Sequence, residues 1–201
     1  ASEGAAATVA PPPPPLGMAQ KLAEDAATAE PGSPDIDALP ILSVLARTLD
    51  QVATLVSLAR NSLYCPDEIC VDFLEIDGIS RAAALIRSLP DTKLILAAPR
   101  VLKPGEEGIW RALLELEPDG LLVRGAGLVR LLRSLGGAGA AVDLPPTDQK
   151  PGKTVRIPPL LGDFSLNVCN ALAADAWLRP EGGLSRLAAA HDLSADAIAE
   201  L

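Results

Sequence analysis

The chain has 201 residues, of which 49% are hydrophobic and 2% aromatic, and its formal net charge is −9 at pH 7. This length suits one domain, or one domain with a tail, and the composition predicts an aliphatic core. The acidic charge argues against a general phosphate-binding surface, and the scarcity of aromatic residues argues against a base-stacking surface for single-stranded nucleic acid. No apolar run reaches the roughly 18–20 residues that span a bilayer, so we expect a soluble protein without a membrane segment.

The first part of the chain, residues 1–38, is rich in alanine and proline. The run Pro11 to Pro15 favours a stiff polyproline II conformation and excludes helix or sheet. We interpret 1–38 as a disordered tail or linker, with a ligand for a proline-binding module as the alternative. The chain begins with Ala1 instead of Met, which fits either a removed targeting segment or a piece of a longer protein, and the sequence leaves both open.

From residue 39 onward, short apolar runs alternate with segments of helical periodicity. We expect strands at 41–46, 68–74, 93–98, 120–123, within 155–162 and at 184–189, and helices at 49–60, 78–89, 106–116, 128–135, 166–178 and from 195 onward. The Gly-, Ala- and Pro-rich stretch 136–159 is predicted to be a long loop. The domain therefore contains about six strand–helix units.

The apolar runs are continuous, which is typical of strands that are buried on both faces of a parallel sheet. An open doubly wound sheet and a TIM-like barrel both fit this pattern. No glycine-rich phosphate fingerprint follows the first run, where Arg47-Thr48-Leu49 stands, and this disfavours dinucleotide binding. A complete barrel takes about 250 residues, so we predict an incomplete parallel α/β barrel over 39–201 that lacks roughly two units.

Polar side chains follow the predicted strands, at the edge of the sheet where barrel enzymes hold their sites. Three arginines with several carboxylates there favour a pocket for an anionic or polar ligand, because guanidinium groups bind carboxylate or phosphate with two hydrogen bonds. The alternative is that these residues only cap strands and pair with one another. The predicted ligand-binding residues are Arg47, Asp72, Glu75, Arg100, Arg124 and Asn170, and the candidate catalytic residues are Asp163, Asn167 and His191.

The remaining nucleophiles carry weaker signals. His191 is the only histidine and is a candidate general base, whereas Ser165 has no nucleophile-elbow glycines around it. Cys65, Cys70 and Cys169 form neither a disulfide framework nor a zinc-binding pattern, so we read them as plain thiols and predict no metal site. We expect Cys169 to lie within the fifth helix, on its inner face, where Asn167 and Asn170 share one side of the helix start.

Four segments in order carry a resemblance to a known family. They are 98–108 with Lys103-Pro104-Gly105, 118–124, 162–172 and 185–193. Together they resemble the collagenase-like peptidase family U 32, in its larger bacterial and plastid members that have a second barrel-like module. The resemblance covers about residues 40–201 and implies a TIM-like barrel.

The resemblance implies two competing activities. Some members are described as metal-dependent collagen peptidases, and others act in oxygen-independent hydroxylation of RNA bases or of a quinone precursor, several with an iron–sulfur cluster. The cluster cysteines of those relatives lie downstream of the point where this chain stops, and none of the three cysteines here matches them. The likeness to plastid members predicts a chloroplast protein, with a bacterial cytoplasm as the alternative.

Three functional hypotheses follow from the sequence. RNA base modification fits an arginine-lined pocket best, with RNA as the substrate. A collagenase-like peptidase acting on a polypeptide is the alternative enzyme, although no zinc-helix motif or catalytic triad is present. A non-catalytic subunit of a larger organellar complex is the third, because Gly125 and Ala190-His191 depart from the family pattern and an incomplete barrel has open edges for a partner or a missing barrel half.

Overall fold

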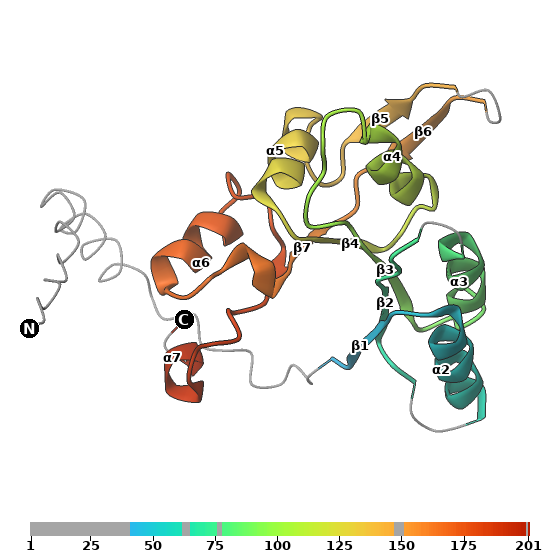
Figure 1. Ribbon diagram of the computed structural model, residues 1–201, viewed down its shortest axis with the longest axis horizontal. Helices are drawn as coiled ribbons and strands as arrows, with labels where there is room; N and C mark the ends of the chain where they lie inside the picture. The colour runs from blue at the N-terminus through green and yellow to red at the C-terminus, as the bar shows by residue number, and fades with distance from the viewer. Residues whose placement is uncertain (1–40, 62–64, 76–77, 147–150, 200) are drawn as a thin grey trace, which may run out of the picture. The chain divides into compact units, whose positions relative to one another are not determined.

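Parallel strands and helices alternate along the chain in the computed structural model, which describes residues 41–61, 65–75, 78–146, 151–199 and 201 (Figure 1). These residues lie within one unit, Ile41–Leu201. The predicted tail, 1–38, lies outside the described residues. No helix in the described part of the chain has the length and apolar character needed to cross a membrane.

The elements match the predicted alternation closely. In chain order they are β1 (Ser43–Ala46), α2 (Leu49–Asn61), β2 (Glu68–Val71), α3 (Ile79–Ile86), β3 (Lys93–Ala97), α4 (Glu107–Glu115), β4 (Gly120–Val123), α5 (Ala126–Ser134), β5 (Ala141–Leu144), β6 (Lys153–Arg156), β7 (Leu160–Gly162), the 3₁₀ helix η1 (Phe164–Leu166), α6 (Ala171–Leu178), β8 (Arg186–Leu187) and α7 (Ala195–Ala199). Two helices begin at side-chain caps: the Thr48 hydroxyl accepts the Gln51 amide, and the Ser194 hydroxyl accepts the Ala197 amide.

Six strands form one parallel sheet in the order β1-β2-β3-β4-β7-β8. The sheet curls, and the described helices lie on its outer side, so the fold is the predicted incomplete TIM-like barrel (Figure 1). An ion pair between two distant strands is consistent with this curl. Arg186 of β8 reaches Glu68 of β2, although three strands lie between them in the sheet.

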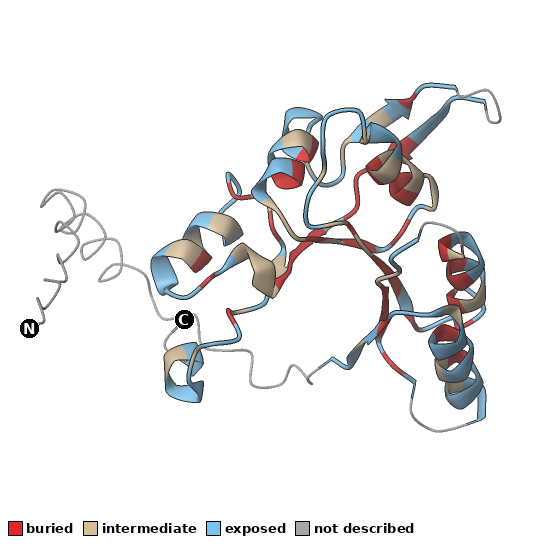
Figure 2. Ribbon diagram, in the orientation of Figure 1, coloured by how far each residue is buried: buried red, intermediate tan, exposed pale blue. Residues whose placement is uncertain are grey.

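The two faces of the sheet carry different apolar clusters, because side chains alternate along a strand. The outer face packs against the helices in a large core that includes Ile69, Leu94, Leu121 and Leu160. Figure 2 shows this burial along the strands and on the helix sides that face them. The inner face holds a smaller cluster, which we call the inner apolar band: Cys70, Ile95 and Leu161, with Ala97 and Leu122 packed against them.

The predicted loop at 136–159 is wrong in part, because it contains the antiparallel pair β5 and β6. Val142 pairs with Val155, and the buried side chains of Leu144, Val155 and Ile157 join the outer core. The glycines and prolines around this hairpin dominate the local composition and hide its short alternating pattern. Other boundaries differ as well. The predicted helix 166–178 begins only at Ala171, and the predicted strand 184–189 is reduced to Arg186–Leu187. The predicted strand 68–74 ends at Val71, and the predicted helix 78–89 ends at Ile86.

Candidate functional site

The site lies at the carboxyl ends of β2, β4 and β7, where the side chains of the inner face continue beyond the strands. Asp72 follows β2, Arg124 follows β4 and Asp163 follows β7, and each lies two residues beyond a member of the inner apolar band. Backbone bonds continue the ladder to this level, since the Asp72 amide donates to Ala46 O and the Asp163 amide donates to Val123 O. The strand period therefore aims all three side chains at the inside of the barrel mouth.

Arg124 joins the two carboxylates. Its Nη1 and Nη2 atoms donate to Asp72 Oδ1 and Oδ2 over 2.7 and 2.8 Å, and its Nε donates to Asp163 Oδ2 over 3.1 Å. The side chains of Arg124, Asp72 and Asp163 are 12%, 14% and 9% exposed. This bidentate geometry suits the planar guanidinium group and would not be reproduced by lysine.

Ser165 fixes the cluster from the following turn. Its Oγ lies 3.0 Å from the Arg124 carbonyl oxygen and 3.1 Å from Asp163 Oδ2, so its one proton is donated to either acceptor. The contact ties the end of β4 to the turn after β7. Ser165 is thereby a positioning residue in this structure.

The electrostatics of the cluster favour its ionised form. Hydrogen bonding and the charge of Arg124 lower the pKa of Asp72, and the bond to Asp72 raises the pKa of Arg124. Below this cluster, burial and the nearby Asp72 charge raise the pKa of Cys70 to about 12. Asp72 and Arg124 therefore serve as fixed charges at neutral pH, and Cys70 is a poor nucleophile.

A cavity of about 630 Å³, which we call the mouth cavity, opens beside the cluster. Arg47, Arg100, Arg124 and Phe164 line it together with apolar side chains of β3, α3, α4 and the segment that follows β2. The five charged groups named so far at the mouth, three arginines and two aspartates, sum to a net charge of +1. This excess is local, because the chain as a whole carries −9.

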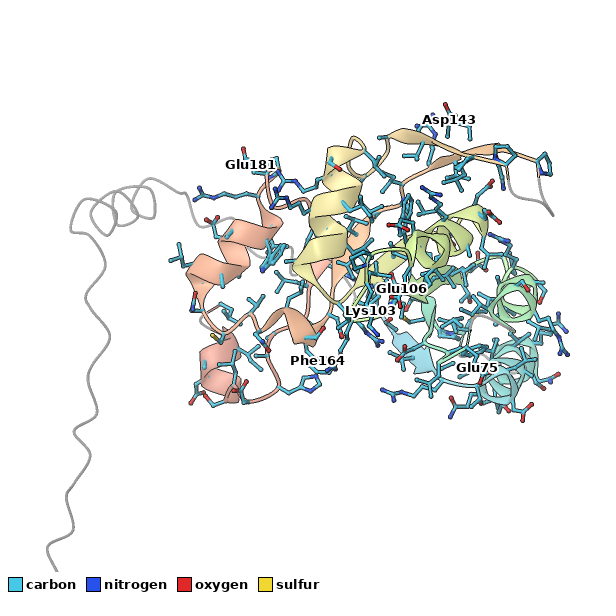
Figure 3. The ribbon with its side chains drawn as sticks, turned by 45° about the horizontal axis from the view of Figure 1, so that its top comes forward. Glu75, Lys103, Glu106, Asp143, Phe164 and Glu181 are labelled. Atoms are coloured by element: carbon cyan, nitrogen blue, oxygen red, sulfur yellow. The ribbon has the colours of Figure 1, made fainter. Side chains whose placement is uncertain are left out.

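Two of these arginines remain accessible for a ligand. The Arg47 side chain is 72% exposed and lies 3.8 Å from Asp72, which is a loose contact. The Arg100 guanidinium lies 5.0 Å from the centroid of the Phe164 ring, and the His191 ring stacks on Phe164 with 3.8 Å between the ring centroids. Phe164, labelled in Figure 3, is half-buried.

The structure thus brings together six of the predicted site residues: Arg47, Asp72, Arg100, Arg124, Asp163 and, through Phe164, His191. The other three lie elsewhere. Glu75 is exposed and does not line the mouth cavity (Figure 3). Asn167 is exposed with a φ of 54°, and Asn170 caps α6 by accepting the Ala173 amide over 2.8 Å.

The region around Cys169 corrects one expectation. The helix begins after Asn170, so Cys169 lies before it and is exposed instead of facing inward. Asn167 therefore shares no helix face with Asn170. The amide side chain of Asn170 makes it a strong N-terminal cap, so α6 starts at Ala171 although the apolar helical pattern reaches back to residue 166.

Phe164 is the site residue that sequence reasoning missed. It is one of two phenylalanines in the chain, and it sits directly after the strand-end residue Asp163. An aromatic side chain at that position is a usable signal in a sequence with 2% aromatic residues. Within the described ranges, no group of three or more histidine, cysteine, aspartate or glutamate side chains is placed to hold a metal ion.

Comparison with known proteins gives no relative: no family model, curated protein or solved structure matches the chain. The fold and the site together define a parallel half-barrel that carries a buried arginine–aspartate cluster and an arginine-lined cavity at the carboxyl ends of its strands.

Proposed function

We propose that the mouth cavity binds a nucleotide unit of RNA, in a protein that resembles the peptidase U 32 family members acting in RNA base modification. The observation that carries the proposal is the pairing of accessible cations with stacked rings. Arg47 and Arg100 line the mouth cavity, and Phe164 with His191 forms an aromatic pair at its border. Guanidinium groups bind phosphate, and aromatic faces stack on bases.

The residues of the mouth take different roles in this proposal. Arg47 and Arg100 contact phosphate, because neither is held by two carboxylates as Arg124 is. The exposed His191 ring offers a stacking surface backed by Phe164. Asp72 and Asp163 fix Arg124 at the cavity wall, and His191 is the candidate general acid–base group.

The test measures binding of a single-stranded RNA of about 12 nucleotides, by fluorescence anisotropy at two salt concentrations. Arg47→Ala and Arg100→Ala are each expected to weaken binding about fivefold and to reduce the salt dependence by roughly one counterion. His191→Ala removes a stacking surface and is expected to cost about fivefold or more, with little change in salt dependence. The control is Arg81→Ala, an exposed arginine of α3 that does not line the cavity.

Equal RNA affinity of Arg47→Ala, Arg100→Ala and Arg81→Ala would overturn the proposal. The same preparations incubated with casein and collagen test the collagenase-like alternative. Cleavage that Asp163→Ala abolishes, in a variant shown to be folded, would favour the peptidase reading instead.

A second candidate function is that of a half-barrel subunit completed by a partner chain that adds parallel strands. The favouring observation is the edge at β1, where Ile41, Leu42 and Leu45 are 54%, 54% and 42% exposed. An edge strand with apolar side chains is a template for further pairing. Hydrogen exchange tests it with the amides of Ser43 and Leu45, which alternate with the residues that bond to β2 and so face the open edge. These two amides should be strongly protected in an assembly isolated from its source and exchange rapidly in the purified chain, and equal exchange would contradict the idea.

A further inference from the structure

Arg47 and Asp72 face each other at the wall of the mouth cavity without a direct hydrogen bond. The Arg47 Nη2 and Asp72 Oδ2 atoms are 3.8 Å apart, which is longer than a hydrogen bond. Both residues line the cavity, so a ligand in it can reach them. We call this place the Arg47–Asp72 gap. A polar contact of this length has room for a third group that bonds to both partners.

Asp72 keeps acceptor positions for such a group. A carboxylate offers roughly four acceptor positions, shared equally between its two oxygens. Arg124 Nη1 and Nη2 donate to one oxygen each, over 2.7 and 2.8 Å, and leave a position on each oxygen. The hydrogen bond and charge of Arg124 lower the pKa of Asp72, so the carboxylate remains an acceptor at neutral pH.

Hydrogen-bond acceptors are scarce among the described side chains that line the mouth cavity. Its three arginines can only donate, and its other polar side chains are Asp72 and Thr48. The Thr48 oxygen already accepts the Gln51 amide over 3.2 Å. A donor group on a bound ligand therefore has Asp72 as its main side-chain partner.

The gap requires a particular kind of chemical group. It has to accept from a guanidinium N–H on one side and donate to a carboxylate on the other. A hydroxyl does both with one oxygen, whereas a phosphate oxygen only accepts and the amino group of a base only donates. In RNA the 2′-hydroxyl lies beside the 3′ phosphate of the same ribose. Because Arg47 has several N–H donors, it can contact this phosphate and the hydroxyl together.

We infer that the Arg47–Asp72 gap binds the 2′-hydroxyl of a ribose, so that the mouth cavity selects ribonucleotides over deoxyribonucleotides. The hydroxyl oxygen accepts from Arg47, and its proton is donated to Asp72. This hydroxyl is the group by which proteins distinguish RNA from DNA. The inference rests on the proposed RNA binding at the mouth, and it names the part of the nucleotide that the site selects.

The test compares three single strands of one sequence, each of about 12 nucleotides. They are RNA, RNA with fluorine at every 2′ position, and DNA with deoxyuridine in place of thymidine. The fluorine keeps the sugar pucker of RNA and removes the donated proton. By fluorescence anisotropy at one salt concentration, we expect RNA to bind at least about fivefold more tightly than either other strand, because each lacks a hydrogen bond to a charged group.

Two arginine variants locate the selected hydroxyl. Arg47→Ala and Arg100→Ala each remove one cation from the cavity, so they form a matched pair. Arg100→Ala should weaken RNA and the 2′-fluoro strand by a similar factor, and the preference for RNA should stay within about twofold of that of the parent. Arg47→Ala should weaken RNA more than the 2′-fluoro strand, and the preference should fall to about twofold or less.

Arg47→Ala is the informative variant because the Arg47 side chain is 72% exposed and its loss leaves the bonds between Asp72 and Arg124 in place. Urea unfolding shows that each variant is folded. Asp72→Asn removes the charged acceptor, and where it is folded it should also lower the preference to about twofold or less.

Equal affinity of the parent for RNA and the 2′-fluoro strand overturns the inference, and a water molecule is then the occupant of the gap. If Arg47→Ala and Arg100→Ala still weaken RNA binding in that case, the proposed RNA binding stands without it. A preference that Arg47→Ala retains in full also overturns the inference, because the hydroxyl is then bound elsewhere. Failure of all three strands to bind overturns the proposed RNA binding and the inference together.

Discussion

The arginine–aspartate cluster at the barrel mouth makes a specific prediction for the substitution Asp72→Asn. The change keeps the shape of the side chain and removes its charge, so that Arg124 loses its bidentate partner and retains only Asp163. Both Asp72 and Arg124 are largely buried. We therefore expect a clear loss of folding stability at neutral pH.

The magnitude follows from the geometry. Two short charge-assisted hydrogen bonds, at 2.7 and 2.8 Å, are replaced by contacts to a neutral amide. Breaking a buried ion pair from one side costs about 3–5 kcal/mol, and the remaining Asp163 bond and the partial exposure of the pair reduce this. The expected loss is about 2–4 kcal/mol in the free energy of unfolding, measured by urea denaturation and compared with Asp91→Asn, an exposed aspartate.

The pH dependence gives an independent check. The pKa of Asp72 is lower in the folded protein than in the unfolded chain, so its ionisation stabilises the fold above an unfolded pKa of about 4. This contribution is lost as the pH falls through the folded-state value. The stability difference between the parent and Asp72→Asn should therefore be largest above about pH 5 and narrow progressively below it.

Two results would refute this reasoning. Asp72→Asn could be as stable as Asp91→Asn near pH 7, which would mean that the cluster contributes little to folding. Alternatively, the difference could stay constant from neutral to acidic pH, which would mean that the substitution acts through packing instead of charge.

Three further predictions concern the same half-barrel. Cys70 should resist maleimide labelling in the folded protein while the exposed Cys65 and Cys169 react. A thiol with a pKa of about 12 has roughly a thousandfold less thiolate at pH 8 than an ordinary cysteine. Labelling of all three cysteines before unfolding, seen by mass spectrometry, would contradict this prediction. Gly125→Ala should cost about 1–3 kcal/mol in urea unfolding because its Cβ would lie 2.8 Å from a backbone oxygen, whereas Gly108→Ala within α4 meets nothing within 4 Å and should stabilise by about 0.5–1 kcal/mol; a reversed order would be inconsistent with the packing. Arg186→Met should cost about 2–3 kcal/mol because it leaves the Glu68 carboxylate buried without its cation, and a loss below about 0.5 kcal/mol would show that the contact is not maintained in solution.

Much of the fold could be predicted because its strands are continuous apolar runs and its helices begin at recognisable caps. The predicted strand 120–123 has the same bounds in the structure, Gly120–Val123, and Thr48 and Ser194, residue types that favour a helix start, cap α2 and α7. The hairpin at β5 and β6 escaped prediction because its buried side chains pack only once the chain has folded. Tertiary burial of Val155 outweighs the glycine and proline around it.

The site was predictable to the extent that strand ends meet at one edge. Topology alone brings Asp72, Arg124 and Asp163 together, whatever the details of their partners. The sequence could not show that Arg124 forms ion pairs with both aspartates while Arg47 stays accessible, because these contacts depend on the curl of the sheet. The sequence also could not place Asn167 and Asn170. Because α6 starts later than predicted, Asn167 lies in the preceding segment and Asn170 is the helix cap, so the two do not share a helix face.

The ion pairs at the two ends of the inner face have a consequence for access to the barrel interior. Glu68 and Arg186 lie at the amino end, and Asp72, Arg124 and Asp163 lie at the carboxyl end, with the inner apolar band between them. Along the barrel axis, the inner apolar band is therefore flanked at both ends by charged side chains, so an apolar group moving along that axis would have to pass an ion pair before reaching the band.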